Sequence, residues 1–285
     1  VKTTPATLAD RWILTRIGQV SDKVAQAIND YQFNDAAGLC YQFVWHEFCD
    51  WYLEMAKQGL YGEDQEQKDA ARHTLLEALA ASLKLLHPFM PFVTEEIWQR
   101  LPGKDGSIMS ATFPDSDDFP KDEDALADMA LLMGVITGIR NIRGEMNLPP
   151  SKSVKVVIDT ADTEEAARLF KNAENLKTLA KVDALDVGAG LLKPEASATT
   201  VFGETTIHVI LKGLMDFEEE KKRIRKSIAK IEKDLKTSEK KLSNKGFLDK
   251  APENIVAEVK AKADTLSAKR DKLAQNLSVL EKIDG

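Results

Sequence analysis

The side chains that most often carry catalysis or bind metals are few in this chain and widely spaced. There are four histidines, His46, His73, His87 and His208, and two cysteines, Cys40 and Cys49. No two histidines stand at metal-ligand spacing and no Cys-x-x-Cys occurs, so we expect no metal site. For the cysteines, two buried free thiols are favoured over a disulfide or a metal site.

Other catalytic patterns are equally scarce. The sequence contains no glycine loop of the P-loop or dinucleotide type and no serine in a nucleophile turn. His46-Glu47 can be imagined as an acid–base pair, but a packing or surface role is favoured. Glu95 and Glu96 are adjacent and point differently on a helix, so helix-start electrostatics explains them better. We therefore predict no catalytic residue and no cofactor in this chain.

The strongest functional signal is a cluster of positive charge in an acidic chain. The net charge is −7, yet residues 221–250 hold ten lysines and two arginines against four acids, a local charge of +8. Lysine and arginine neutralise phosphates in nucleic-acid complexes with little reading of sequence. A solvated helix face is the alternative. The predicted contact residues are Lys221, Lys222, Arg223, Arg225, Lys226, Lys230, Lys233, Lys240 and Lys241.

A second, smaller set of cations flanks the junction between a long helix and a mixed α+β unit. It consists of Arg140, Arg143 and Lys152. For these residues two roles have equal weight: structural pairing, for example of Arg143 with Glu145, and contact with a nucleic acid.

The elements that must position these charges begin with residues 6–101, which predict an up-and-down helical bundle. Residues 31–35 interrupt the first helix, and Asn34 or Asp35 is expected to cap the next one. Apolar residues recur at helical spacing, and a crowd of aromatic residues on the second helix needs mutual burial. The aromatic crowd comprises Phe43, Trp45, Phe48, Trp51 and Tyr52.

The segment HPFMPFVTEEIWQRLP (87–102) predicts a break between two helices. Pro88 and Pro91 exclude a helix through the residues between them, because proline lacks the backbone donor and restricts its predecessor. Thr94 is expected to cap the helix that restarts, with two acids at its positive end. Residues 102–121 are rich in Gly, Ser, Asp and Pro and predict a surface linker.

The rest of the chain predicts two further parts. A helix from Asp124 to about Met146 is followed by strands at 154–158, 185–187 and 199–211, with a helix over 164–181, which is a small α+β unit. Residues 214–285 carry two heptad patterns joined by the loop SNKGFLDKAPEN. They predict an antiparallel coiled-coil hairpin with Lys221, Ser238 and Arg270 on an imperfect seam. The expected class is mainly α, in three domains: 1–120, 121–213 and 214–285.

The composition limits the class of protein and the compartment that we expect. The chain has 285 residues, 43% hydrophobic and 30% charged, which is typical of a soluble folded protein with two or three domains. No run of apolar residues approaches the ~20 needed to span a bilayer, and no signal peptide opens the sequence. The chain begins at Val1 rather than Met, so we expect a piece of a longer cytoplasmic protein that makes no membrane contact.

Several segments together resemble one family of RNA-binding enzymes. Four of them are similar to the anticodon-binding helical domain of class I aminoacyl-tRNA synthetases of the Val/Ile/Leu group. They are LADRWILTRI (8–17), YQFNDAAGLCYQFVWHEFCDWYLEMAK (31–57), HPFMPFVTEEIWQRLP (87–102) and SIMSATFP (107–114). Two others resemble the valyl-tRNA synthetases in particular: IRNIRGEMNLPPSK (139–152) and the hairpin loop LSNKGFLDKAPENIV (242–256).

The resemblance implies a tRNA-binding C-terminal region whose partners are tRNA, specifically tRNA(Val), and the rest of its own chain. The catalytic domain, where ATP would bind, and the editing domain are expected elsewhere, since neither catalytic signature of the family occurs here. The first helix of the anticodon domain is expected to be missing, so this piece should be an inactive monomer. Arg11 and Arg16 are possible anticodon contacts, whereas Trp12 is expected to be packed. The corner aromatics Phe89, Phe92 and Trp98 are expected in the core.

Two other functions stay open at this point. The first is a free-standing RNA-binding protein that uses the same domain in trans. The second is an interaction protein whose hairpin pairs with another coiled coil. Salt-insensitive self-association of residues 214–285 would favour the second, because a coiled-coil interface is mainly apolar, whereas RNA binding depends on salt.

Overall fold

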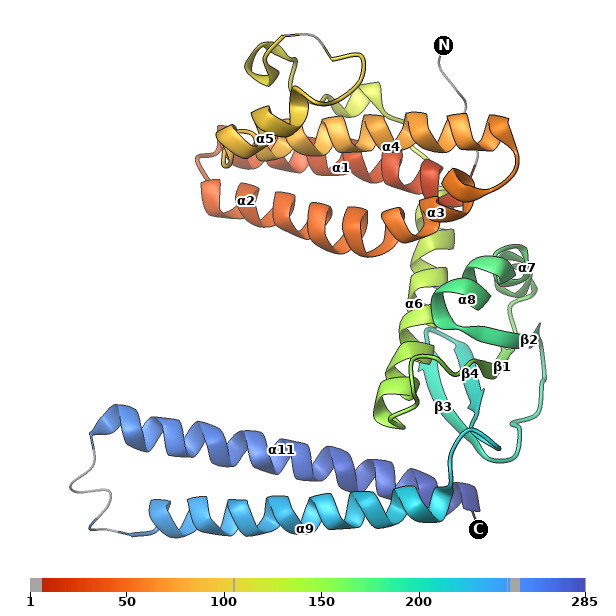
Figure 1. Ribbon diagram of the computed structural model, residues 1–285, viewed down its shortest axis with the longest axis vertical. Helices are drawn as coiled ribbons and strands as arrows, with labels where there is room; N and C mark the ends of the chain where they lie inside the picture. The colour runs from red at the N-terminus through yellow and green to blue at the C-terminus, as the bar shows by residue number, and fades with distance from the viewer. Residues whose placement is uncertain (1–6, 105, 245, 247–251, 285) are drawn as a thin grey trace. The chain divides into compact units, whose positions relative to one another are not determined.

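The computed structural model describes residues 7–104, 106–244, 246 and 252–284. The chain divides into two compact units, residues 1–134 and 135–285. Figure 1 shows that the first is built from helices, whereas the second combines helices with a small sheet and a long helical hairpin. The predicted class, mainly α with a small α+β unit and a C-terminal hairpin, is confirmed.

The first unit is organised around α1 (Leu8–Asn29). Thr7 caps this helix: its hydroxyl accepts from the Asp10 N–H, and the Asp10 carboxylate accepts from the Thr7 N–H at 3.1 Å. This capping box satisfies donors that the first turn would otherwise leave open. The helix packs against α2 (Phe33–Tyr41) and α4 (Gln65–Leu86), as a bundle requires. Its buried apolar face is formed by Trp12, Ile13, Ile17, Val20 and Val24.

The second helical stretch runs without a break through α2, the π-helical segment η1 (Gln42–Tyr52) and α3 (Leu53–Tyr61). Phe43 and Phe48 are both buried five residues apart, which matches the i→i+5 repeat of a π-helix. The expected burial of every aromatic residue is wrong for Trp45, which is 54% exposed. The π-helical turn leaves Trp45 exposed to solvent, whereas Phe43 and Phe48 of the same segment are buried.

Local expectations about this stretch were met only in part. The predicted caps Asn34 and Asp35 are wrong, because α2 already begins at Phe33, and Gln32 at the cap position makes no side-chain bond. Both cysteines are free thiols, as expected; Cys40 is fully buried and Cys49 is half-buried. Burial raises the pKa of the Cys40 thiol to about 11, so this thiol stays protonated at neutral pH.

The proline corner has the predicted break but restarts earlier than expected. α4 ends at Leu86, and α5 (Pro91–Trp98) begins at Pro91, because proline suits a first helical position whose N–H needs no partner. Thr94 is therefore not the cap. It is buried inside α5, where its hydroxyl donates to the Met90 carbonyl at 2.8 Å and lies 2.7 Å from Nδ1 of His87.

The corner aromatics have three different environments. Trp98 is buried with Ala80, Leu83 and Ile108, as expected, and Phe89 is half-buried. The prediction for Phe92 is wrong: it is 91% exposed, because the helix that starts at Pro91 turns its first residues outward. The Glu95 carboxylate accepts from the Ser107 hydroxyl and the Ile108 N–H, both at 3.0 Å. These bonds hold the linker, which contains the short helices η2 (Ile108–Ser110) and η3 (Ser116–Asp118).

A buried hydrogen bond in this unit supports the first prediction. The Tyr52 hydroxyl donates to the Asp10 carboxylate at 3.0 Å, so we expect Tyr52→Phe to lower the free energy of unfolding by about 1–3 kcal/mol. Burial and the Asp10 charge raise the pKa of Tyr52. Ionised Tyr52 therefore favours the unfolded chain, and the gap between the wild type and the variant should shrink as pH rises above about 10.

Urea unfolding at pH 7 and above pH 10 measures both effects. The control is Tyr31→Phe, which removes the hydroxyl of a side chain that is 81% exposed and should change stability by less than about 0.5 kcal/mol. Equal effects of the two substitutions would contradict the role of the Tyr52 hydroxyl.

In the second unit a long helix packs on a sheet. The helix is α6 (Glu123–Glu145), whose later turns belong to this unit. A Cβ at Gly138 would come within 2.9 Å of Thr200 Cγ2 and 3.3 Å of Ile207 Cδ1, so glycine permits the close approach. By length and composition, α6 is the one described helix that could cross a membrane. Its buried Ile136, Ile139 and Ile142 instead give it the pattern of a core helix.

The sheet has the strand order β2-β1-β4-β3. Strands β1 (Val154–Asp159) and β2 (Val182–Gly188) are parallel, and α7 (Thr163–Lys171) and α8 (Ala173–Ala180) form the crossover between them. Strands β3 (Ser197–Phe202) and β4 (Thr205–Ile210) form an antiparallel hairpin beside β1. The predicted strands are confirmed, and the predicted single helix over 164–181 is divided at Asn172.

The C-terminal hairpin consists of α9 (Phe217–Leu242) and α11 (Glu253–Asp284), which lie side by side and antiparallel (Figure 1). Ile224, Ile231 and Leu235 of α9 are buried on the predicted seam, together with Ala263 and Leu280 of α11. The polar seam residues Lys221 and Ser238 are also buried, each 6% exposed. The predicted loop includes residues 245 and 247–251, which lie outside the described part of the chain.

Candidate nucleic-acid interface

The outward side of α9 carries only positive charge over most of its length. Because Ile224, Ile231 and Leu235 face α11, the heptad positions opposite them point to solvent. The acids of the middle of this helix, Glu232, Asp234 and Glu239, fall beside the seam. We call the exposed outward set the cation face: Lys222, Arg223, Lys226, Lys230, Lys233, Lys236 and Lys240.

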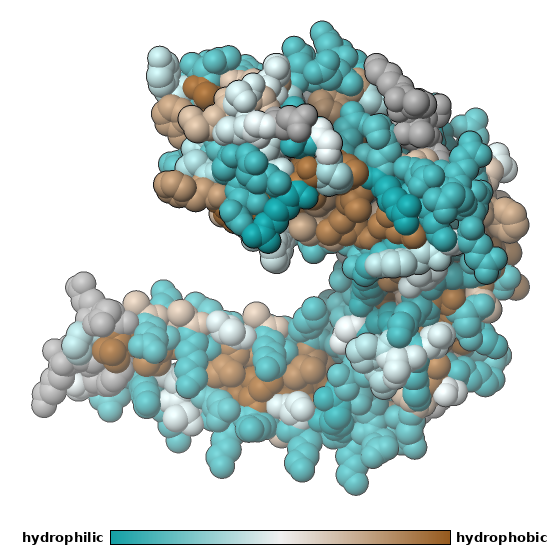
Figure 2. Space-filling view, turned by 45° about the horizontal axis from the view of Figure 1, so that its top comes forward, coloured by the Kyte–Doolittle hydropathy of each residue, from teal (hydrophilic) through white to brown (hydrophobic). Residues whose placement is uncertain are grey.

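The centre of the cation face is a regular row. Lys226, Lys233 and Lys240 recur at heptad spacing and are all exposed. With a rise of about 1.5 Å per residue, neighbours in this row lie roughly 10 Å apart along the helix. Among the described residues no carboxylate pairs with them. Figure 2 shows that hydrophilic residues cover much of the visible surface of the hairpin.

Ion pairs hold three of the predicted contact residues. Lys221 is buried, with its ammonium nitrogen 3.0 Å from a Glu218 oxygen. Arg223 donates to both oxygens of Glu220, with Nε at 2.7 Å. Arg225 reaches across to Glu281 of α11 at 2.8 Å and links the two helices. The Arg225 pair is exposed on both sides, and because exposed pairs contribute only about 0–1 kcal/mol, a phosphate can compete for its guanidinium group. The Arg223 pair is bidentate and its Glu220 carboxylate is mostly buried, so it holds Arg223 more firmly.

The cations near the end of α6 are mostly engaged with backbone carbonyls. Arg143 is 9% exposed and donates to the carbonyls of Pro149 and Pro150 at 3.2 and 3.4 Å, and burial lowers its pKa. Arg140 is exposed and donates to the Leu179 carbonyl through Nε and Nη2, at 3.2 and 2.9 Å. Lys152 donates to the Leu214 carbonyl at 2.8 Å. Of the two roles weighed for these residues, the geometry favours structural pairing for Arg143.

The two predicted arginines of the bundle are tied to acids. Arg16 forms a forked pair with Glu47 of η1, at 2.6 and 2.8 Å, and these bonds raise its pKa. Arg11 pairs with Asp122 at 2.8 Å. Trp12 between them is 3% exposed, which confirms the expectation that it is packed. These contacts join α1 to its neighbours within the first unit.

An exposed aromatic surface on the bundle was missed by the sequence reasoning. Tyr41 and Trp45 are each more than half exposed and lie nearly parallel, with ring centroids 6.4 Å apart. Tyr31 and Phe33 meet edge to face nearby in sequence and are also exposed. Exposed rings of this kind can stack on unpaired bases. The i,i+4 spacing of Tyr41 and Trp45 was the available signal.

Two family profiles match the chain. The profile described as the anticodon-binding domain of tRNA ligase covers residues 10–158, which is more than half of the sequence. The profile described as the valyl tRNA synthetase tRNA binding arm covers residues 216–281, and so includes the cation face.

Curated relatives extend the similarity over almost the entire chain. The valine–tRNA ligase of Syntrophotalea carbinolica is 46% identical over 277 residues, covering 96% of this chain and 31% of that protein. The ligase of Geobacter sulfurreducens is 44% identical, covering 98% and 32%. That of Thermotoga maritima is 42% identical, covering 96% and 30%. The chain therefore spans about a third of the length of these relatives.

Proposed function

The chain belongs to the valyl-tRNA synthetase family as its C-terminal part, and from this we propose that it holds tRNA(Val) by the anticodon stem-loop and the tRNA body. The observation that carries the proposal is the cation face, seven exposed cations on one side of a narrow hairpin, of which only Arg223 has a carboxylate partner among the described residues. Such a surface suits a phosphate backbone, because each lysine or arginine that meets a phosphate releases condensed counterions.

Each of the three proposed domains has its own role in binding the tRNA. Residues 1–120 form the bundle that meets the anticodon stem-loop, where unpaired bases offer stacking faces to rings such as Tyr41 and Trp45. Residues 121–213 connect the bundle to the arm. Residues 214–285 form the arm, whose lysines and arginines contact phosphates and sugars. Arg11 and Arg16 support the surface of the bundle indirectly, because their ion pairs fix the position of α1 against its neighbours.

The whole protein, on this proposal, joins valine to tRNA(Val) with ATP in the cytoplasm and acts as a monomer. ATP binds in a catalytic domain outside these 285 residues, and the present chain contributes no reacting group. Its contribution is positional: binding energy gained far from the reacting bond holds the acceptor end in place, and well-oriented groups react much faster than free ones.

Titration of the 285-residue chain with fluorescent tRNA(Val) tests the proposal. We expect binding whose affinity falls steeply with salt and which exceeds that for a tRNA with another anticodon. An RNA hairpin of equal length that lacks the tRNA fold is the matched control for nonspecific attraction. Equal affinity for all three RNAs would overturn the proposal, as would salt-insensitive self-association of the chain without RNA binding.

A further inference from the structure

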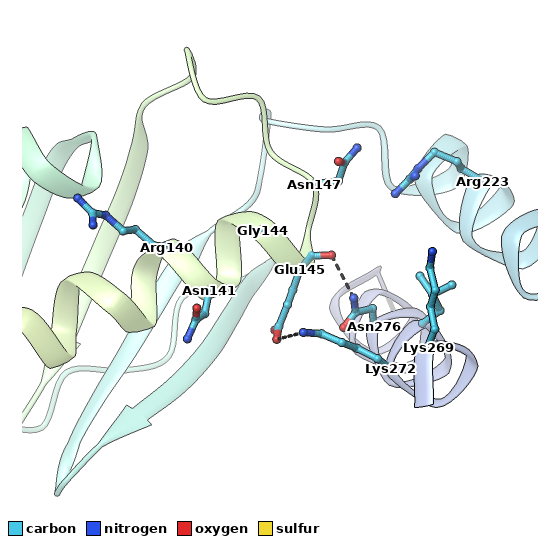
Figure 3. Close-up of a pocket in the computed structure, with 10 residues that line it drawn as sticks. Arg140, Asn141, Gly144, Glu145, Asn147, Arg223, Lys269, Lys272 and Asn276 are labelled. Atoms are coloured by element: carbon cyan, nitrogen blue, oxygen red, sulfur yellow. Dashed lines mark hydrogen bonds and ion pairs between the residues drawn. The ribbon is translucent and has the colours of Figure 1, made fainter. Parts of the chain in front are cut away.

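A polar cleft of about 500 Å³ lies at the base of the arm. It forms where the end of α6 meets the first turns of α9 and the second half of α11, all within the second unit. Figure 3 shows side chains from these three segments around it. It is an open cleft whose volume is in the range of small-molecule sites, and its residues come from parts of the chain more than 100 positions apart.

Direct contacts fix the walls of the cleft. The Asn276 amide of α11 donates to the Glu145 carbonyl at the end of α6, at 3.1 Å (Figure 3). Lys272 lies 3.6 Å from the Glu145 carboxylate. The Asn276 amide satisfies a carbonyl that the last turn of α6 leaves open, and the Lys272 cation suits the negative end of that helix. These contacts attach the arm to the long helix, so the cleft is part of the folded unit.

The charge of the cleft is one-sided. Four cations line it, Arg140, Arg223, Lys269 and Lys272, against the single carboxylate of Glu145. Lys269 is exposed and has no carboxylate partner within the described ranges. Arg223 also belongs to the cation face, so a phosphate backbone that follows this face reaches the cleft at its near end.

Two of the asparagines that line the cleft are Asn141 and Asn147, and the fold does not require the side-chain amide of either one. Asn147 has a φ of 50° and ends α6 in a Schellman arrangement, in which the Leu148 N–H bonds to the Arg143 carbonyl at 2.9 Å. Glycine would serve that backbone equally well, and the Asn147 amide is left exposed. Asn141 is likewise exposed on α6 and, in the described part of the chain, its amide makes no hydrogen bond.

We propose that this cleft binds one unpaired nucleotide of the bound tRNA, with its phosphate at Lys269 and its base at the Asn147 amide. An amide both donates and accepts, which suits the edge of an unpaired base, and a point charge suits a phosphate. The inference rests on the proposed function, because it names a ligand subsite for the same RNA. It adds recognition of a nucleobase at the point where the arm begins, whereas the cation face contacts only the charged backbone of the RNA.

The test uses the full chain and a set of tRNA(Val) molecules, each with one unpaired nucleotide made abasic. For the wild type we expect one abasic position to weaken binding about tenfold, since a stacked or bonded base contributes this much. In the double variant Asn141→Ala, Asn147→Gly the same position should cause no further loss. Glycine retains the left-handed backbone of Asn147, so the variant should keep its fold.

Two single variants separate the parts of the site. Lys269→Ala should lower the slope of log affinity against log salt by about 1, because it removes one phosphate contact. Lys262→Ala makes the same charge change on α11 outside the cleft and should leave the abasic profile unchanged.

The outcomes distinguish this inference from its premise. If the wild type binds tRNA(Val) but its abasic profile equals that of the double variant, the cleft proposal is overturned while the RNA-binding function stands. If the wild type does not bind tRNA(Val), both are overturned. Calorimetric binding of free AMP, CMP, GMP or UMP that is lost in the double variant, together with a flat abasic profile, would assign the cleft to a free nucleotide and also overturn the proposal.

Discussion

Replacement of Lys226, Lys233 and Lys240 by alanine will weaken tRNA(Val) binding about 100-fold at 0.1 M salt. These three residues form the central row of the cation face, and each is exposed without a carboxylate partner among the described residues. Loss of three phosphate contacts at a slope of about 0.7–0.9 each should also reduce the salt dependence by about 2–3. Fluorescence anisotropy across a salt series measures both quantities.

The matched control removes three lysines elsewhere, namely Lys171 of α7 and Lys260 and Lys262 of α11. The net charge changes by the same amount, but these residues share their surroundings with acids such as Glu258 and Asp264. We expect less than a tenfold change. If the two triple variants lose equal affinity, general charge rather than the cation face attracts the RNA.

The second large effect comes from the seam of the hairpin. Ile231 is 8% exposed between α9 and α11, so Ile231→Asp removes an apolar contact and buries a charge without a partner. We expect the arm to lose about 3–5 kcal/mol of stability and much of its helical circular-dichroism signal. RNA affinity should fall to the level of the lysine variant, because the cations remain but no longer lie on one rigid face.

Ala261→Asp is the control for this substitution, because it adds the same charge on an exposed position of α11. It should leave helicity intact and reduce affinity only slightly. Undiminished RNA binding by a chain whose arm has unfolded would show that the lysines act without the hairpin, and would contradict the geometric role of the seam.

The sequence alone determined the architecture wherever the physics is local. Heptad spacing over 214–285 predicts the hairpin, since residues seven apart fall on one side of each helix. Pro88 and Pro91 predict the break after α4, since a backbone without an N–H cannot continue a helix. The cation face was also visible as an excess of lysine on one amphipathic helix.

Tertiary structure decided which side chains remain available. Trp45 and Phe92 are aromatic residues of the type expected in a core, yet the π-helical turn and the early start of α5 leave them exposed. The sequence alone does not distinguish the roles of Arg223 and Arg143. In the structure Arg223 lies on the cation face, whereas Arg143 is buried against the Pro149 and Pro150 carbonyls.

The cleft at the base of the arm could not be predicted from the sequence. Asn147, Arg223 and Lys269 line it together, although long stretches of chain separate them. Periodicity predicts which face of one helix is apolar, because that depends on neighbours a few residues away. It does not predict which distant segments meet, because that depends on how whole elements pack. The sequence therefore determined the helices and their charge, and only the packing of α6, α9 and α11 created the site between them.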